Sequence, residues 1–437
     1  MTDSQFSEAS LSLLRLLAGG KTKRVFENPQ DKNQVYVVSG DDITAGDGAK
    51  HDVIATKGAL STRTTTNVFG LLKRCGIPVA FDRQVAPHVF LAPACQMLPY
   101  EVVVRREGYG SSLKRRPYLK KGHIFPKLVV EFFLKTNGRK WKGHDLPCDD
   151  PLMVVLENDM IALYEPSKPF DGSDPFLLLH SEEVHSVESE ETLYPEMAAI
   201  AVRAFLALEK AWQQQGGKLV DFKVEFGIDS SERLLLADVI DSDSWRVIID
   251  GKHVDKQAYR EGAALDEVLE KFRLGMELTS RFGLPTQQVV IWTGSPSDDT
   301  NPIEEAIAVL SNGAVGIKKI TCSAHKEPIL ASEELHAATQ EVPDSVIIAL
   351  IGRSNGAGPT LSACTTVPVI TIPANFDRFP EDVWSSLRSP SDVPVMTVLD
   401  SKNAVLAALN ILALNSPLLY MRMRERLEKR LVNVVRI

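Results

Sequence analysis

The chain has 437 residues, of which 44% are hydrophobic and 24% charged, so it is long enough for two or three folded domains and is not of disordered composition. A formal net charge of −8 argues against a general nucleic-acid binder, because such proteins carry a basic excess that neutralises phosphates. The five cysteines are scattered and include no Cys-x-x-Cys pair, which favours reduced thiols in the cytoplasm over a disulfide framework or a zinc site.

Neither a signal peptide nor a membrane span is expected. The N-terminal stretch "MTDSQFSEASLSLLRLLAGG" starts acidic and lacks a long apolar core followed by a cleavage site. The most apolar segment, residues 403–419, is interrupted by three asparagines and a proline. It predicts one buried or interface helix.

The first half of the chain, to about residue 260, has the mixed pattern of an α+β domain. Strand-like segments at 33–40 and 101–106 alternate with a helical segment at 195–215, in which apolar residues recur at helical spacing. Two polar or acidic stretches, 136–151 and 180–191, are predicted to be surface insertions.

A charged helical segment at 265–282 ends in a Gly-Leu-Pro stop signal and is the candidate linker between the halves. Strands and helices then alternate in a way that predicts βαβ crossovers and a parallel sheet. The expected strands are 288–294, 317–322, 344–351 and 367–374, and the expected helices are 301–313 and 327–341.

Three polar loops, "GSPSD", "SAHK" and "GRSNGAGP", follow predicted strands of this sheet. Ligands bind where the carboxyl ends of parallel strands meet their loops, so the three loops are expected to converge on one cleft. Ser295 and Asp298 in the first loop could equally be a helix N-cap and a first-turn acid. In the third loop, glycines allow close backbone approach, and Arg353 and Ser354 are donors suited to a phosphate.

These loops, with "EDVWSSLRSPS" after them, resemble the aminoimidazole ribonucleotide (AIR) carboxylase family over residues 286–420. They look most like its animal-type class II members, which carry Ser-Ala-His-Lys. The resemblance implies that His325 carries the proton lost from the substrate carbon and that Lys326 holds the carboxylate. It also implies a group of residues that cradle ribose and phosphate: Ser295, Asp298, Ser323, Arg353 and Ser354. CO₂ would be a substrate, and no biotin, metal or ATP is implied for this step.

In the first half, "GGKTKRVF" predicts either a β-hairpin lid over a polyphosphate or an edge strand protected by lysines. "VDFKVEFG" places Asp221, Lys223 and Glu225 on one face of a strand, which is either solvated or lines a cleft. Asp238 follows a very apolar strand. Glu225 and Asp238, arriving from adjacent strands, could hold Mg²⁺, which prefers oxygen ligands.

These segments, together with "DDITAGDGAK", "MLPYEVVVRREGYGSSLKR" and "LADVIDSDSWR", resemble the SAICAR synthetase family over residues 15–262. That family joins L-aspartate to carboxyaminoimidazole ribonucleotide (CAIR) with ATP. The resemblance implies an adenine hinge from Met97 to Glu101. The residues implied for ATP are Lys21, Lys23, Met97, Glu101 and Lys223, those for CAIR are Arg105, Ser111 and Arg260, and those for Mg²⁺ are Glu225 and Asp238.

We therefore expect a SAICAR synthetase domain at 1–262, a linker helix at 263–285, and a three-layer α/β AIR carboxylase domain at 286–437. The carboxylase would make the acid that the ligase consumes, and the resemblance implies a homo-octamer. Two alternatives remain: the second half is a mutase acting on N5-carboxylated AIR, or the chain is a non-catalytic nucleotide-binding scaffold. The insertion at 136–151 leaves the roles of Lys135 and Asp150 open, and Glu327 stands where the carboxylase family has a small residue.

Overall fold

A computed structural model describes residues 11, 13–20, 22–45, 50–136, 138–157, 159–170, 174–186 and 193–433. It divides into two compact units. The first extends to Gly283 and includes the chain from Glu428 onward, and the second spans Leu284–Leu427. Among the described helices, none combines the length and the hydropathy needed to cross a membrane.

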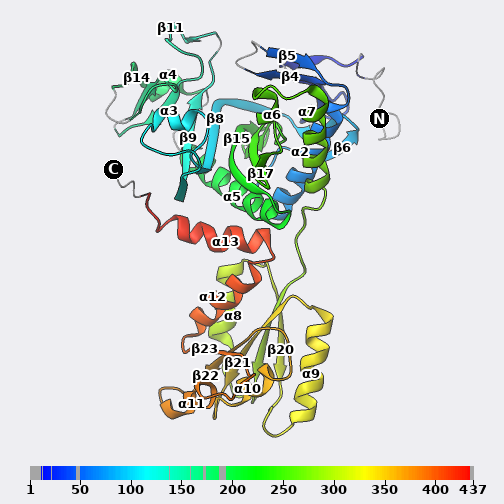
Figure 1. The fold of residues 1–437 in the computed structure, drawn as a ribbon, viewed down its shortest axis with the longest axis vertical. Helices are drawn as coiled ribbons and strands as arrows, with labels where there is room; N and C mark the ends of the chain where they lie inside the picture. The colour runs from blue at the N-terminus through cyan, green and yellow to red at the C-terminus, as the bar shows by residue number, and fades with distance from the viewer. Residues whose placement is uncertain are drawn as a thin grey trace. The chain divides into compact units, whose positions relative to one another are not determined.

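The first unit is built on two antiparallel sheets (Figure 1). The smaller has the strand order β1-β2-β3-β7-β6, with bounds Leu16–Gly19, Lys23–Glu27, Gln34–Ser39, Val89–Pro93 and Arg83–Ala86. The larger has the order β14-β13-β12-β9-β8-β15-β17-β18, and β16 also pairs with β15. Its strands are β8 Cys95–Glu107, β9 Ile124–Leu134, β12 Leu152–Val155, β13 Met160–Tyr164, β14 Leu177–His180, β15 Lys218–Asp229, β16 Leu234–Ala237, β17 Trp245–Ile249 and β18 Lys252–His253.

Two small hairpins and several helices complete this unit. The hairpins are β4 Asp42–Ala45 with β5 Lys50–Val53, and β10 Lys140–Trp141 with β11 His144–Asp145. The helices are α2 Lys57–Arg74, α3 Ser111–Arg115, α4 Ser181–Val184, α5 Leu193–Gln214, α6 Gln257–Arg260 and α7 Leu265–Thr279.

Helix α5 covers the large sheet with an apolar face. Its Phe205 ring lies 5.5 Å from that of Phe222 on β15, and its Trp212 ring lies 5.3 Å from that of Trp245 on β17. All four rings are at most 3% exposed, so this contact forms much of the core that fixes β15. The α+β prediction for the first half is confirmed.

Helix α7 packs inside the first unit, whereas the sequence set residues 263–285 apart as a linker. Its Val268 and Phe272 are at most 1% exposed and cluster with Tyr259 and Ile43. The helix ends at Thr279, four residues before Gly283. Periodicity alone predicted the helix, but not the surface on which its apolar stripe is buried.

The second unit is a parallel five-stranded sheet of order β20-β19-β21-β22-β23. Its strands are β19 Gln288–Thr293, β20 Gly316–Thr321, β21 Ser345–Ile351, β22 Val369–Pro373 and β23 Val395–Thr397. Its helices are α8 Asn301–Ser311, α9 Pro328–Glu341, α10 Ala357–Ser362, η3 Pro380–Val383, α11 Trp384–Leu387, α12 Ser401–Leu412 and α13 Pro417–Glu428.

Helices lie on both faces of this sheet. Along β21, Ile348 packs with Ile307 of α8 and Leu409 of α12, whereas Ile347 packs with Leu335 of α9 and Leu361 of α10. Successive residues of a strand face opposite ways, so one strand supplies both cores. The prediction of a three-layer α/β unit is confirmed.

One prediction about this unit was wrong. Residues 403–419 do not form one helix, because α12 ends at Leu412 and α13 begins at Pro417. Proline lacks an amide hydrogen and its ring clashes with the preceding turn, but it is tolerated at the first turn of a new helix. Apolar residues keep their helical spacing across residues 413–416, so the sequence pattern did not reveal the break between the two helices.

Candidate functional site

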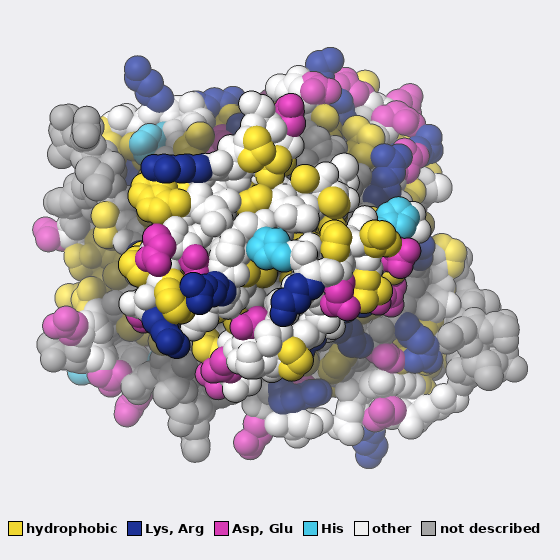
Figure 2. All heavy atoms as spheres, turned by 90° about the horizontal axis from the view of Figure 1, so that it is seen from below, with side chains coloured by type: hydrophobic (Ala, Val, Ile, Leu, Met, Phe, Trp, Pro, Cys, Tyr) yellow, Lys and Arg dark blue, Asp and Glu magenta, His cyan; other side chains and the backbone are white. Residues whose placement is uncertain are grey.

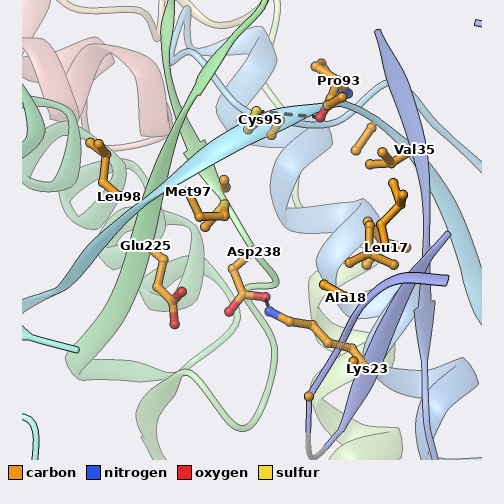
Figure 3. A pocket seen from close by; sticks show the side chains of 18 of the residues that line it. Leu17, Ala18, Lys23, Val35, Pro93, Cys95, Met97, Leu98, Glu225 and Asp238 are labelled. Carbon is orange, nitrogen blue, oxygen red and sulfur yellow. Dashed lines mark hydrogen bonds and ion pairs between the residues drawn. The ribbon is translucent and has the colours of Figure 1, made fainter. Parts of the chain in front are cut away.

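A cavity of about 650 Å³ lies beneath the β1-β2 hairpin of the first unit. Strands β3, β7 and β8 supply an apolar wall that includes Val37, Phe90 and Met97, and the hairpin supplies the segment from Leu17 to Gly20. Figure 3 shows Glu225 and Asp238 extending from neighbouring segments at the polar side of this cavity, with the Lys23 ammonium beside Asp238. The hairpin is thus observed, with β1 at the edge of its sheet, and Glu225 lines a cleft, whereas the role of the hairpin as a lid over a polyphosphate stays a prediction.

Each carboxylate of this cavity has a lysine partner. Lys23 forms an ion pair with Asp238, and the Lys135 Nζ lies 2.7 Å from the Glu225 carboxylate. Burial lowers the pKa of Lys23 to about 8, against the opposing charge of Glu225. Burial works against ionisation of Glu225, but Lys135 and Lys23 outweigh it and lower the pKa of Glu225. When a polyphosphate binds, its negative charges can replace the two carboxylates as partners of Lys23 and Lys135.

Local backbone geometry sets the direction of Asp238. It directly follows β16, whose Ala237 pairs with Glu225 of β15, so the two carboxylates are neighbours across the ladder. Asp238 has φ of 65°, in the left-handed region that aspartate tolerates better than most non-glycine residues. A backbone conformation of this kind at a cavity wall is typical of functional positions.

The donor set fits Mg²⁺ shared with a nucleotide. No group of three or more His, Cys, Asp or Glu side chains arranged for a metal occurs in the described part of the chain. Glu225 and Asp238 are two oxygen donors, and Mg²⁺ is commonly held by one or two carboxylates plus phosphate oxygens and water. The two residues thus suit a metal that arrives with its phosphates better than an all-protein metal cage.

A second cavity of about 430 Å³ lies across β8 and β15 and contains most of the remaining residues predicted for the first unit. It is lined by Ser111 and Arg260, and also by Glu101 and Lys223, which form a 2.5 Å ion pair. The sequence grouped Glu101 and Lys223 with Met97 around ATP. The structure instead places Met97 in the first cavity and that ion pair in the second, because β8 runs continuously from one to the other.

Arg105 also lines the second cavity but has partners within the protein. Its guanidinium donates to Glu131, at 2.8 Å, and to Asp221. It is 4% exposed. The Arg260 guanidinium, by contrast, has only a 3.4 Å hydrogen bond to Gln257 among the described residues, so its charge is available to an anion.

Sequence reasoning did not assign three cations of these cavities. Lys135 of the first cavity was left open, and Arg246 and Lys256 of the second were not singled out. Arg246 could have been predicted from the sequence, since it is the last residue of the segment "LADVIDSDSWR". Lys256 carries no local signal, because its place beside the cavity depends on the turn between β18 and α6. Lys21 lies outside the described residues.

In the second unit, the three predicted loops meet at the carboxyl edge of the sheet. A methyl group added at Gly352 would lie 2.6 Å from the Asp298 carboxylate, so the loops after β19 and β21 touch. One added at Gly356 would lie 3.3 Å from the His325 Nε2 and 3.6 Å from the Ser354 hydroxyl. The expected convergence is confirmed for these three loops.

The loops at this edge are fixed by hydrogen bonds to backbone amides, while several of their polar side chains are exposed. The Asp298 carboxylate accepts from the Ser295 amide at 3.0 Å and also faces Gly352. The N-cap interpretation of Ser295 and Asp298 was wrong, because the following helix begins at Asn301, with Thr300 at its N-cap and Glu304 as its first-turn acid. In the second loop, the Lys326 amide donates to the Ser323 carbonyl at 3.1 Å. The side chains of His325, Lys326 and Arg353 are exposed.

Comparison with known proteins defines the class of the two units. The SAICAR synthetase family model matches residues 16–157 and 162–273, and the AIR carboxylase family model matches residues 288–431. The chain therefore joins a ligase domain and a lyase domain of purine biosynthesis.

Full-length relatives have the same two-domain organisation. The bifunctional phosphoribosylaminoimidazole carboxylase/succinocarboxamide synthetases of Drosophila melanogaster and Homo sapiens are 33% and 34% identical to the chain. The alignments cover 97% and 95% of this chain and 94% and 93% of those proteins. The solved SAICAR synthetase (type 2) in complex with ADP is 25% identical, with a TM-score of 0.47, over 61% of this chain and 97% of its own. The chain belongs to the family of bifunctional AIR carboxylase/SAICAR synthetase enzymes.

Proposed function

We propose that the second unit carboxylates AIR with CO₂ to give CAIR, and that the first unit joins CAIR to L-aspartate with ATP, giving SAICAR, ADP and phosphate. The observation that carries this proposal is the pairing, in one chain, of a cavity with two lysine-matched carboxylates and a sheet edge where His325, Ser354 and Asp298 meet. Each arrangement meets a separate chemical need.

For the carboxylation, the substrate is an enamine-like carbon nucleophile. Its C4 attacks the carbon of CO₂, and one C–O π pair moves to oxygen to form a carboxylate. C4 must then lose a proton, which we assign to His325, since an imidazole can exchange protons in both directions near neutral pH. Lys326, exposed beside it, neutralises the new carboxylate.

The other loops of the second unit bind the nucleotide part of AIR. Ser295, Asp298 and Ser323 supply hydroxyl and carboxylate groups for the ribose, and Arg353 with Ser354 supplies donors for the 5′-phosphate. The glycines at 352 and 356 support this role, since a Cβ there would press on Asp298 and His325.

For the ligation, the CAIR carboxylate attacks the γ-phosphorus of ATP and ADP leaves. The aspartate amine then attacks the acyl carbon, phosphate departs with the C–O electron pair, and the ammonium proton passes to solvent. Mg²⁺, held by Glu225 and Asp238, would supply neutralisation of phosphate charge. Lys23 and Lys135 are placed to pair with phosphates, and the apolar wall around Met97 suits an adenine ring.

The second cavity is the place we propose for CAIR and aspartate. Arg260 and Ser111 are the available donors for the CAIR phosphate, and the Glu101–Lys223 pair lines the same cavity. Arg105 acts here by holding Asp221 and Glu131, so its contribution to binding is indirect.

We also propose a cytoplasmic location and a homo-octamer, as the resemblance implies. The five cysteines are free, which suits a reducing compartment. Exposed apolar side chains of the second unit, among them Val309, Ile329 and Leu414, suit contacts between copies.

The test is a two-stage assay on purified protein. AIR and bicarbonate are supplied first without ATP, and formation of CAIR is followed by ultraviolet absorbance. ATP, Mg²⁺ and aspartate are then added. We expect CAIR in the first stage and ADP with SAICAR only in the second. Turnover of N5-carboxylated AIR, without turnover of AIR and CO₂, would establish the mutase alternative. If neither AIR with CO₂ nor N5-carboxylated AIR is turned over, the result would support the non-catalytic scaffold.

A further inference from the structure

In the second unit, the side chain of Arg353, the proposed phosphate-binding arginine, packs on the ring of Phe379. The Arg353 guanidinium carbon lies 4.6 Å from the centre of the Phe379 ring, and that of Arg378 lies 5.1 Å from the same ring. Among the described residues, the Arg353 guanidinium makes no hydrogen bond or ion pair. Its contact with the Phe379 ring therefore leaves its N–H donors free. A cation held on a ring face keeps its N–H groups available at the edges.

The Phe379 segment also holds the backbone on either side of Arg353. It belongs to the stretch between β22 and η3, which follows the neighbouring strand of the sheet. Within this stretch Asn375 donates to the Gly352 carbonyl, and just after it the Asp382 carboxylate accepts from the Ser354 amide at 3.1 Å. The three consecutive residues Gly352–Ser354 are thus each contacted from one segment.

The contact between Phe379 and Arg353 can reduce the entropy that Arg353 loses when it binds a phosphate. Arg353 is exposed, and a free arginine side chain samples many rotamers that must be given up when it binds a phosphate. Ser354 next to it has φ of 51°, an unfavourable left-handed conformation for serine that Asp382 helps to maintain. Ordering the guanidinium before the substrate arrives lowers the cost of binding.

We propose that Phe379 is a positioning residue for AIR: its ring orders the Arg353 guanidinium toward the 5′-phosphate before substrate binds. This inference rests on the proposed phosphate role of Arg353. The contacts described for the Phe379 ring are with Arg353 and Arg378 and not with His325, so we expect it to act on substrate affinity and not on the chemical step.

The test compares steady-state carboxylation by full-length F379L, F379Y, R353Q and the F379L/R353Q double variant. Since an exposed cation–π contact is worth a small free energy, F379L should raise KM for AIR about two- to fivefold, with kcat nearly unchanged. F379Y keeps a ring and should restore the original KM. In the R353Q background, F379L should add nothing, because the group that it orders is gone.

A matched control is W384L. Trp384 is an exposed ring with Arg388 at 4.8 Å, in the same unit but outside the three strand-end loops, so its loss should leave KM for AIR unchanged. Circular dichroism and size-exclusion chromatography of every variant establish that fold and assembly are intact.

The outcomes separate the inference from its basis. An unaltered KM in F379L, an equal KM increase in W384L, or an F379L effect that persists in R353Q would each overturn the inference while leaving the proposed reaction intact. An unaltered KM in R353Q would overturn the phosphate role of Arg353 itself, and the inference with it.

Discussion

At the scale of single residues, the first cavity depends on matching each carboxylate with a lysine. Burial lowers the pKa of Lys23 to about 8. Its ammonium form therefore begins to be lost just above neutral pH, whereas an ordinary lysine keeps its charge to about pH 10.

This predicts a pH dependence for the ligase. As pH rises through 8, Lys23 loses its proton, and kcat/KM for ATP should fall about fivefold between pH 8 and pH 9. In K23R the charge persists, so that fall should be absent even though the absolute rate is lower. Rates measured with saturating CAIR, aspartate and Mg²⁺ test this, and an equal decline in both proteins would assign the titration to another group.

A second residue-scale prediction concerns Glu131, which accepts from three arginines, Arg105, Arg115 and Arg116, at 2.7 to 3.2 Å. Burial opposes ionisation of Glu131, but the three guanidiniums outweigh it and lower its pKa to about 2. A depressed carboxyl pKa stabilises the fold above the unfolded value near 4.5, and this contribution is lost as pH falls toward 2.

E131Q should therefore lower the free energy of unfolding by roughly 3 kcal/mol at pH 7, because it removes the Glu131 carboxylate from the buried Arg105 and Arg115 and from the partly buried Arg116. The deficit should shrink as pH falls below 4.5. E165Q, which removes a carboxylate paired with the exposed Lys168, is the control and should change stability by no more than about 0.5 kcal/mol. Urea denaturation across this pH range measures both, and a deficit independent of pH would contradict the role of the charge.

At the scale of elements, the second unit was predictable because each of its loops follows a strand that points the same way. Helical and strand periodicities set the order of elements, and the parallel sheet then brings Asp298, His325 and Ser354 to one edge. The Phe379 contact could not be predicted, since nothing in "NFDRFPED" indicates which strand-end loop it covers.

The first unit was less predictable at this scale. The strand β15 was foreseen from its alternation, yet the sequence could not tell that β8 passes both cavities, so Met97 and Glu101 were grouped together although they line different ones. In an antiparallel sheet the position of a side chain depends on register and bulges, such as that between Glu225 and Gly227.

The position of α7 supplies a prediction at this scale. Phe272 is 1% exposed and lies against the buried Lys57, whose ammonium is 5.1 Å from its ring and 3.0 Å from Asp243. F272A should lower the free energy of unfolding of the ligase unit by about 3 to 5 kcal/mol and weaken ligation, because Asp243 lines the second cavity.

L265A on the same helix is the matched control, since Leu265 is 36% exposed and its truncation should cost less than about 1 kcal/mol. Denaturation curves and ligase rates for both variants decide the matter. If both variants behave like the unmodified protein, α7 is only a connector, as the sequence had indicated.

At the scale of the whole molecule, the formal net charge is −8. On the face drawn in Figure 2, acidic and basic side chains are interspersed with hydrophobic ones. The charge that matters for function is instead local, at the two cavities and the sheet edge, where it faces small anionic substrates.

Two compact units in one chain suit two consecutive reactions, provided that each unit works on its own. The direct measurement is product formation by H325N and D238N with each substrate supplied separately. We predict that H325N makes no CAIR from AIR and bicarbonate yet converts added CAIR to SAICAR, that D238N shows the reverse, and that an equal mixture forms SAICAR from AIR. Carboxylation by H325N at the rate of the unmodified protein, or ligation that survives in D238N, would contradict the assignment of the two reactions to these sites.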